Sequence, residues 1–121
     1  MHTLSTVFQI IIALGIFNVW LLRFGSSTEW RGGEAQNMKE EFAAYGLPAW
    51  FMIAIGIAKV GLASLLLAGL WLPEITRFAA LGMVALMLGA VSMHIKVGDP
   101  LRKSLPALSM LAMSTFVAAV G

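Results

Sequence analysis

Lys59 is the residue with the clearest capacity for chemistry, because it stands alone in an otherwise apolar stretch from Pro48 to Pro73. That stretch is long enough to cross a bilayer. A charged side chain near the middle of such a span costs about 3 kcal/mol on insertion scales, so it normally faces protein or water rather than lipid. We therefore predict that Lys59 belongs to a functional site. The alternative is a lysine that snorkels to the interface or stays neutral between helices.

The surroundings of Lys59 can be estimated from the helical rise, which places it about 16 Å below the face that carries the largest loop, at a depth reached near Ile11 in the first span. The polar residues expected near that depth in an antiparallel bundle are Gln9, Ser114 and Thr115. None of these is a carboxylate. Glu40 or Glu41 would supply one if the loop folded back between the helices, since pairing lowers the cost of burying each charge. Otherwise a neutral amine would be available for proton transfer.

A second pair of chemically capable residues, His94 and Asp99, lies five residues apart in the segment MHIKVGDP. Asp99 either orients the imidazole or, with Pro100, marks the turn into the last helix. His94 either forms hydrogen bonds at the head-group level or binds the carbonyl of a quinone-like molecule beside an apolar slot. As a metal site the pair is incomplete. The missing ligands would have to be found among Glu29, Glu34, Glu40 and Glu41.

The elements that must position these residues are apolar helices. Of the 121 residues, 60% are hydrophobic and 12% are charged, which exposes too much apolar surface for a water-soluble globule. The sequence predicts an all-α integral membrane protein, a single domain built as an antiparallel bundle of four transmembrane helices. The predicted spans are residues 4–22, 48–72, 75–95 and 104–120. Gln9 and Asn18 are the polar interruptions of the first span, and Trp20 near its end suits the membrane interface.

Two further patterns concern how the helices are joined and packed. The polar loop at about residues 23–47 is too long for a simple turn, so it should carry structure of its own. Within it, residues 37–45 fit a short amphipathic helix, with Met38, Phe42 and Tyr45 facing the membrane or the bundle. In the third span, the small residues Gly82, Ala85, Gly89 and Ser92 form one stripe, where another helix is expected to approach closely.

Composition also excludes several classes of function. The chain has no cysteine, so it cannot supply thiol relays, disulfides or cysteine ligands for iron–sulfur clusters. No basic run interleaved with aromatic residues suggests nucleic-acid binding. The positive charges instead predict topology, because six of them lie in the two loops on one face and only Arg77 lies on the other. Those loops are predicted to be cytoplasmic, with both termini outside. The six are Arg23, Arg31, Lys39, Lys96, Arg102 and Lys103.

Three motifs give the sequence a family resemblance. They are YGLP before the second span, IG-x-x-K-x-G-x-A-x-LL within it, and MLGA-x-x-x-H-x-x-x-GD at the end of the third, followed by LPAL. In this order the chain resembles the DoxX-like membrane proteins from about Asn18 to Leu108. The resemblance implies a four-helix bundle in a bacterial-type inner membrane. Lys59 stands where many relatives have glutamate. The matching positions are Gly46, Leu47, Pro48, Gly56, Lys59, Gly89, Ala90, His94, Gly98 and Asp99.

The resemblance also implies an association with respiratory, sulfur-oxidising or oxidative-stress systems. The first hypothesis is therefore an accessory subunit that binds a partner protein or a quinone-like or lipid ligand, with no covalently bound cofactor and no enzyme activity of its own. The second is an oligomeric small-solute or proton-coupled transporter that uses Lys59. The third is a structural assembly factor in which polar residues set helix register. The expected partners are the lipid bilayer and either further copies of the chain or a larger membrane redox complex.

Overall fold

The computed structural model describes residues 2–26, 28 and 30–120. Its four long helices are α1 (His2–Phe17), α3 (Ala49–Ala68), α4 (Thr76–Lys96) and α5 (Leu101–Val120). A π-helical turn, η1 (Asn18–Leu22), continues α1, and a 3-10 turn, η2 (Pro73–Ile75), precedes α4. The short helix α2 (Met38–Ala44) lies in the loop between η1 and α3. The predicted all-α fold class is confirmed, and four helices are long and apolar enough to cross a membrane.

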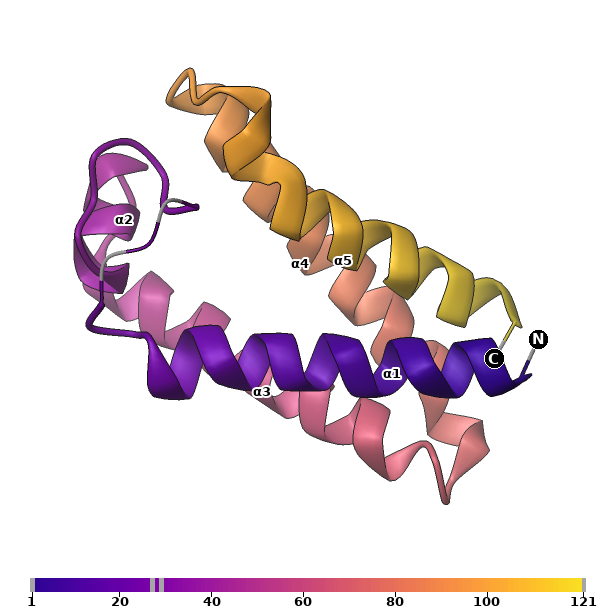
Figure 1. The fold of residues 1–121 in the computed structure, drawn as a ribbon. Helices are drawn as coiled ribbons and strands as arrows, with labels where there is room; N and C mark the ends of the chain where they lie inside the picture. The colour runs from indigo at the N-terminus through magenta and orange to yellow at the C-terminus, as the bar shows by residue number, and fades with distance from the viewer. Residues whose placement is uncertain (1, 27, 29, 121) are drawn as a thin grey trace.

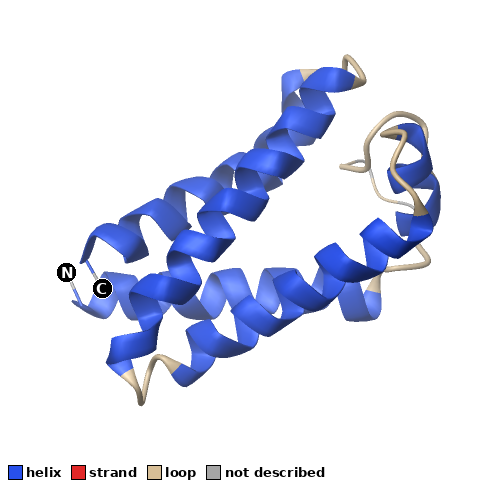
Figure 2. Cartoon of the chain, turned by 180° about the vertical axis from the view of Figure 1, so that it is seen from behind, coloured by secondary structure: helices blue, strands red, loops and turns tan. Residues whose placement is uncertain are grey.

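The helices form two antiparallel pairs, α1 with α3 and α4 with α5, and further contacts join α3 to α4 and α1 to α5. Figure 1 shows that the two pairs meet near the chain termini and diverge toward the end where α2 lies. The reverse view in Figure 2 shows the same separation. We call the end with the termini and the turn at residues 69–75 the closed end. The end with the loop at residues 23–47 and the turn at residues 97–100 is the open end.

Two helix boundaries differ from the sequence pattern for local reasons. The α-helical part of the second span ends at Ala68, and tight turns carry the chain from Gly69 to the 3-10 turn. Gly69 lies close to the Thr76 hydroxyl, which donates to the Gly69 carbonyl at 3.3 Å. The last helix begins three residues earlier than expected, at Leu101. Pro106 is therefore its sixth residue, where the missing N–H removes one backbone hydrogen bond.

The loop at the open end is folded, as predicted. Asn37 caps α2 by accepting a hydrogen bond from the Glu40 N–H at 2.8 Å, while the Glu40 carboxylate accepts one from the Gln36 N–H. This resembles a capping box, except that the N–H donor to the Glu40 carboxylate belongs to Gln36 and not to the N-cap residue Asn37. The residues predicted to face either the membrane or the bundle are buried within the protein: Met38, Phe42 and, just after α2, Tyr45.

The outer surface of the bundle is apolar along its length. Exposed large side chains occur on every long helix, and they include Leu14, Ile57, Phe78 and Leu105. Trp50 and Trp71, at the two ends of the second span, are 70% and 78% exposed. Tryptophan favours the membrane–water interface, so these two rings fit the expected boundaries of the hydrocarbon layer. The molecule is a multi-pass membrane protein.

Candidate functional site

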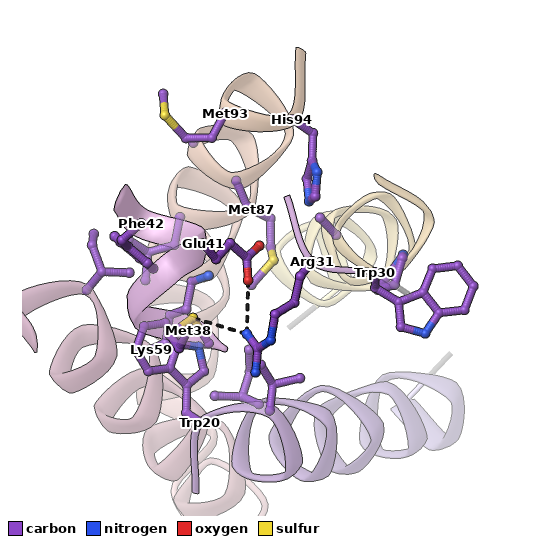
Figure 3. A pocket seen from close by; sticks show the side chains of 18 of the residues that line it. Trp20, Trp30, Arg31, Met38, Glu41, Phe42, Lys59, Met87, Met93 and His94 are labelled. Carbon is purple, nitrogen blue, oxygen red and sulfur yellow. Dashed lines mark hydrogen bonds and ion pairs between the residues drawn. The ribbon is translucent and has the colours of Figure 1, made fainter. Parts of the chain in front are cut away.

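A cavity of about 800 Å³ lies between the two helix pairs at the open end, below the loop. Figure 3 shows part of its lining. Most of the wall is apolar and comes from every long helix, with Ile16 on α1, Phe51 and Ile55 on α3, Met87 on α4 and Met110 on α5. The polar and charged lining comprises Asn18, Arg23, Thr28, Arg31, Glu41, Lys59, His94 and Lys103.

Lys59 reaches this cavity from α3. Its ammonium lies 5.6 Å from the centroid of the Trp20 ring, a cation–π contact. Gly56, one turn earlier on the same face, makes this arrangement fit, because a Cβ at residue 56 would lie 2.7 Å from the Trp20 ring. Among the described residues, no hydrogen bond or ion pair reaches the Lys59 Nζ atom. Within the described part of the chain, the partner of the amine is thus the face of the Trp20 ring, and the amine borders the cavity.

Trp20 owes its position to the π-helical turn η1. The wider turn closes with a hydrogen bond from the Arg23 N–H to the Asn18 carbonyl at 2.9 Å. Single π-helical turns inside α-helices occur frequently at functional sites. From Trp20 a row of aromatic rings leads across the loop side of the cavity. The successive centroids, Trp20 to Phe42 to Tyr45 to His94, lie 6.0, 6.1 and 6.0 Å apart.

His94 and Asp99 form a buried pair on the opposite helix pair. The His94 Nδ1 atom lies 2.7 Å from the Asp99 carboxylate, and the Asp99 N–H donates to the His94 carbonyl at 3.0 Å. Both roles considered for Asp99 are thus present, since it holds the imidazole and shapes the turn. With Nδ1 donating to Asp99, Nε2 is an acceptor in the neutral ring and a donor in the protonated one.

Arg31 and Glu41 form a second buried pair above the cavity. The Arg31 guanidinium donates to the Glu41 carboxylate at 3.0 Å and to the backbone carbonyls of Arg23, Phe24 and Ser26. Glu41 also accepts from the Gly32 N–H at 3.1 Å and from the Tyr45 hydroxyl at 2.7 Å. Burial and, secondarily, the Glu41 charge raise the pKa of Tyr45 well above its ordinary value of 10.0.

Three hydrogen bonds fasten the loop to the α4–α5 pair across the open end. Asp99 accepts from the Gly33 N–H at 3.0 Å, Lys96 donates to the Tyr45 carbonyl at 2.8 Å, and Lys103 donates to the Gly33 carbonyl. Gly33 has a φ of +58°, a conformation that other residues rarely adopt. The carboxylate that holds His94 is thereby also a fastening point for the loop.

Comparison with protein families matches residues 10–117 to the DoxX-like family. The match includes Lys59, the His94–Asp99 pair and the entire loop. The chain belongs to the DoxX-like family. The comparisons with curated proteins and with solved structures found no match.

The structure brings together some of the residues that the sequence singled out in this DoxX-like protein. Lys59, His94, Glu41 and Asn18 line one cavity, and Asp99 holds His94 from behind. Glu41 does fold back over the bundle, but its ion-pair partner is Arg31 rather than Lys59. Glu40 is exposed and serves as a cap of α2.

Gln9, Ser114 and Thr115 are not partners of Lys59. Gln9 donates to the Leu66 carbonyl at 2.8 Å, and the exposed Thr115 bonds within its own helix to Leu111. Ser114 is fully buried, and its hydroxyl has no hydrogen bond to any described residue.

The depth estimate failed because α3 extends past the end of α1 at the open end. Gln9 pairs with Leu66, and Trp20 contacts Gly56, so the α1 residue level with Lys59 is close to Ile16. Counting from the loop had placed it near Ile11, more than one helical turn away. The polar residues expected beside Lys59 therefore lie nearer the closed end.

Two other expectations concern the remaining acidic residues and the small-residue stripe. Glu34 is exposed, Glu29 lies outside the described residues, and no three His, Asp or Glu side chains cluster in the described part.

The stripe on α4 permits close packing only at its beginning, where Gly82 meets Leu62. At Gly89 a Cβ would have nothing within 4 Å, because the helix there borders the cavity. The expected close approach was wrong at that position.

Sequence reasoning missed the roles of Arg31 and Trp20. Arg31 was counted as a loop charge, yet it is 4% exposed and organises the loop. No sequence spacing signals this, because its partners are mostly backbone carbonyls. Trp20 suited an interfacial position but is 8% exposed and faces Lys59. The signal for its burial was Gly56, whose missing side chain leaves room for the ring.

Proposed function

We propose that this DoxX-like protein binds a lipophilic molecule in the cavity and serves as a non-catalytic accessory subunit of a membrane redox system. The observation that carries the proposal is an apolar cavity with the Lys59 amine and the His94 ring on its wall. Its volume of about 800 Å³ falls within the usual range of about 300 to 1,000 Å³ for small-molecule sites.

The lining suits a flat ligand with polar oxygens, as in a quinone. The aromatic row from Trp20 to His94 offers faces and edges against which a planar ring packs favourably. Lys59 supplies N–H donors, and the second nitrogen of His94 supplies another hydrogen-bonding point. The apolar side chains of α3, α4 and α5 accommodate a hydrocarbon tail.

The redox reaction itself is assigned to partner proteins. The chain contains no cysteine, and its ionisable residues near the cavity bind and orient rather than transfer electrons. This role predicts that native membranes yield the protein together with a cytochrome-bearing or other redox partner. Purification in a mild detergent followed by absorption spectroscopy and mass spectrometry checks this, and recovery of the chain with no redox protein contradicts it.

We place the protein in a bacterial-type inner membrane with the open end in the cytoplasm. Both charged loops lie at that end, and most of their basic residues are exposed, although the buried Arg31 adds nothing to the surface charge. Single cysteines at the exposed positions Thr3 and Gln36 provide the test, because the chain has none of its own. In intact cells an impermeant maleimide should label position 3 only. Labelling of position 36 from outside contradicts this orientation.

Tryptophan fluorescence tests ligand binding directly, because quinones quench nearby indole rings. Trp20 and Trp30 line the cavity, while Trp50 and Trp71 lie at the two ends of the second span. In the double variant Trp50→Phe/Trp71→Phe only the cavity tryptophans remain. Titration of this variant in phosphatidylcholine nanodiscs with a 2,3-dimethoxy-5-methyl-6-alkyl-1,4-benzoquinone should give saturable quenching.

The matched control keeps the opposite pair of tryptophans. In Trp20→Phe/Trp30→Phe, quenching should rise in proportion to the quinone dissolved in the lipid, without saturation. Equal, non-saturating quenching in both double variants would show that the quinone only dissolves in the bilayer, and the proposal would fail.

A further inference from the structure

The charged groups around the cavity are paired, with one exception inside it. Arg31 pairs with Glu41, His94 pairs with Asp99, and Lys103 lies 3.9 Å from the same Asp99 carboxylate. Arg23 is exposed at the rim, where water and lipid head groups reach it. Lys59 has no carboxylate within ion-pair distance among the described residues. In the part of the chain that the structure describes, one positive charge of the cavity thus lacks an ion-pair partner.

Contacts within the loop keep the Glu41 carboxylate from pairing with Lys59. Glu41 is the carboxylate that lines the cavity, and its oxygens are already engaged by Arg31, the Gly32 N–H and the Tyr45 hydroxyl. Turning Glu41 toward Lys59 would leave the buried Arg31 guanidinium without its carboxylate partner, which is strongly unfavourable. Glu40 is exposed, and its carboxylate accepts a hydrogen bond from the Gln36 N–H at the start of α2. Neither of the two carboxylates that the sequence suggested as partners, Glu40 and Glu41, is therefore free to move to Lys59.

Trp20 only partly replaces a counter-charge. A cation–π contact attracts the ammonium but accepts none of its N–H bonds. The amine therefore keeps its donors for whatever enters the cavity. An oxygen atom with a negative charge would satisfy both the charge and the donors at once, and a charge-assisted hydrogen bond is stronger than a neutral one.

We propose that the physiological ligand of the cavity is an anionic amphiphile, with one ionised oxygen acid that binds Lys59 and an apolar body along the helices. This inference rests on the proposed function and narrows it, since a neutral quinone lacks the charge. Two sources supply the same chemistry: the ionised hydroxyl of a hydroxyquinone and the carboxylate of a fatty acid. In either case Lys59 contributes charge recognition, and the apolar wall contributes most of the contact area.

The sharpest test uses two probes that differ in charge and otherwise only by one methyl group. A 2-hydroxy-3-alkyl-1,4-naphthoquinone is ionised at neutral pH, whereas its 2-methoxy ether is neutral and has the same rings and tail. Both are titrated into the Trp50→Phe/Trp71→Phe protein in phosphatidylcholine nanodiscs, with each dissociation constant corrected for partition into empty nanodiscs. We expect the ionised probe to bind about 10- to 100-fold more tightly than the ether, the range for a hydrogen bond to a charged group.

Substitution of Lys59 assigns the preference to this residue. Lys59→Met should reduce the ratio between the two probes to about one, because it removes a charge-assisted hydrogen bond from the ionised probe and only a weaker, neutral one from the ether. Lys59→Arg, which keeps the charge, should keep most of the preference. Lys39→Met removes a positive charge from the exposed side of α2 and should change neither constant. Displacement of the ionised quinone by oleate identifies carboxylates as a second accepted source, and failure of oleate to compete restricts the class to hydroxyquinones.

The outcomes separate this inference from the proposed function. Equal binding of both probes to the parent protein would overturn the anion preference and leave a neutral ligand site. An undiminished preference in Lys59→Met would also overturn it, because the charge would then be recognised elsewhere. Saturable binding of neither probe nor of a benzoquinone would refute the ligand site itself. If Lys59→Met fails to fold, the probe pair and Lys59→Arg still decide the matter.

Discussion

Ala79 and Ala90 lie eleven residues apart on α4, three helical turns, and therefore on the same face of one helix. Ala79, at the closed end, is fully buried and belongs to the hydrophobic core. Ala90, toward the open end, is partly accessible and lines the cavity. The same small residue on the same face permits close helix packing at one end and leaves space at the other.

The difference shows that close packing and the cavity occupy separate lengths of the same four helices. At the closed end the interior is filled by small and apolar side chains such as Ala13, Ala63, Leu66 and Ala80, all fully buried. At the open end the helix pairs are linked through the loop, whose hydrogen bonds to Asp99, Lys96 and Lys103 replace direct helix contact. Substitutions at the two ends should consequently affect different properties.

The largest effect on stability is expected from Arg31→Met. It removes hydrogen bonds to three backbone carbonyls and leaves the Glu41 carboxylate without its cation. Breaking a buried ion pair costs about 3 to 5 kcal/mol, so the thermal unfolding temperature in detergent should fall strongly. Arg102→Met, at an exposed position in the first turn of α5, is the matched control and should have little effect. Equal stability of the two variants would mean that the loop does not hold the open end.

A smaller loss, about 2 kcal/mol, is expected from Ala79→Leu, because added methyl groups in a filled interior force neighbouring side chains and backbone to shift. The variant should unfold at a lower temperature, yet its quinone titration should be unchanged once it is folded. A weaker dissociation constant in folded Ala79→Leu would show that the two ends are coupled.

The fold could be predicted from the sequence because each span is apolar over a length that only a membrane helix requires. The apolar face of α2 was also predictable, since Met38, Phe42 and Tyr45 recur at helical spacing, although the spacing left open whether it faces the membrane or the bundle. These features depend on local composition and period. They do not depend on how one helix is shifted along another.

The site was predictable only in part, because its geometry depends on that shift. Lys59 and His94 were identified as single residues in unusual surroundings. The neighbours of Lys59 could not be identified, because the level of α1 beside it depends on how far α3 extends past η1. The pairing of Arg31 with Glu41 instead of Lys59 depends on the folded path of the loop, which no periodic pattern encodes.

Tyr45 is expected to lower the free energy of unfolding by about 1 kcal/mol for each pH unit above pH 10. Its pKa is raised by burial and by Glu41, so the folded protein favours the neutral phenol, while the unfolded chain ionises near pH 10. Stability from this group is therefore fully present below about pH 10 and is lost as the pH rises further. Unfolding temperatures of the parent protein and Tyr45→Phe, measured from pH 8 to 11, should converge above pH 10. A constant difference across this range would contradict the raised pKa.

Ala90→Leu should have the smallest effect on stability, within about 0.5 kcal/mol, because its side chain enters existing space instead of a filled interior. Unlike Ala79→Leu, which should leave quinone binding unchanged, Ala90→Leu should weaken it. Residue 90 precedes His94 by one turn on the same face, so a leucine there would occupy the cavity beside the imidazole. We expect about 10-fold weaker binding of the quinone probe, measured by cavity tryptophan quenching. Unchanged binding would mean that the cavity does not hold the quinone probe. Destabilisation as large as in Ala79→Leu would mean that α4 is packed alike along its length.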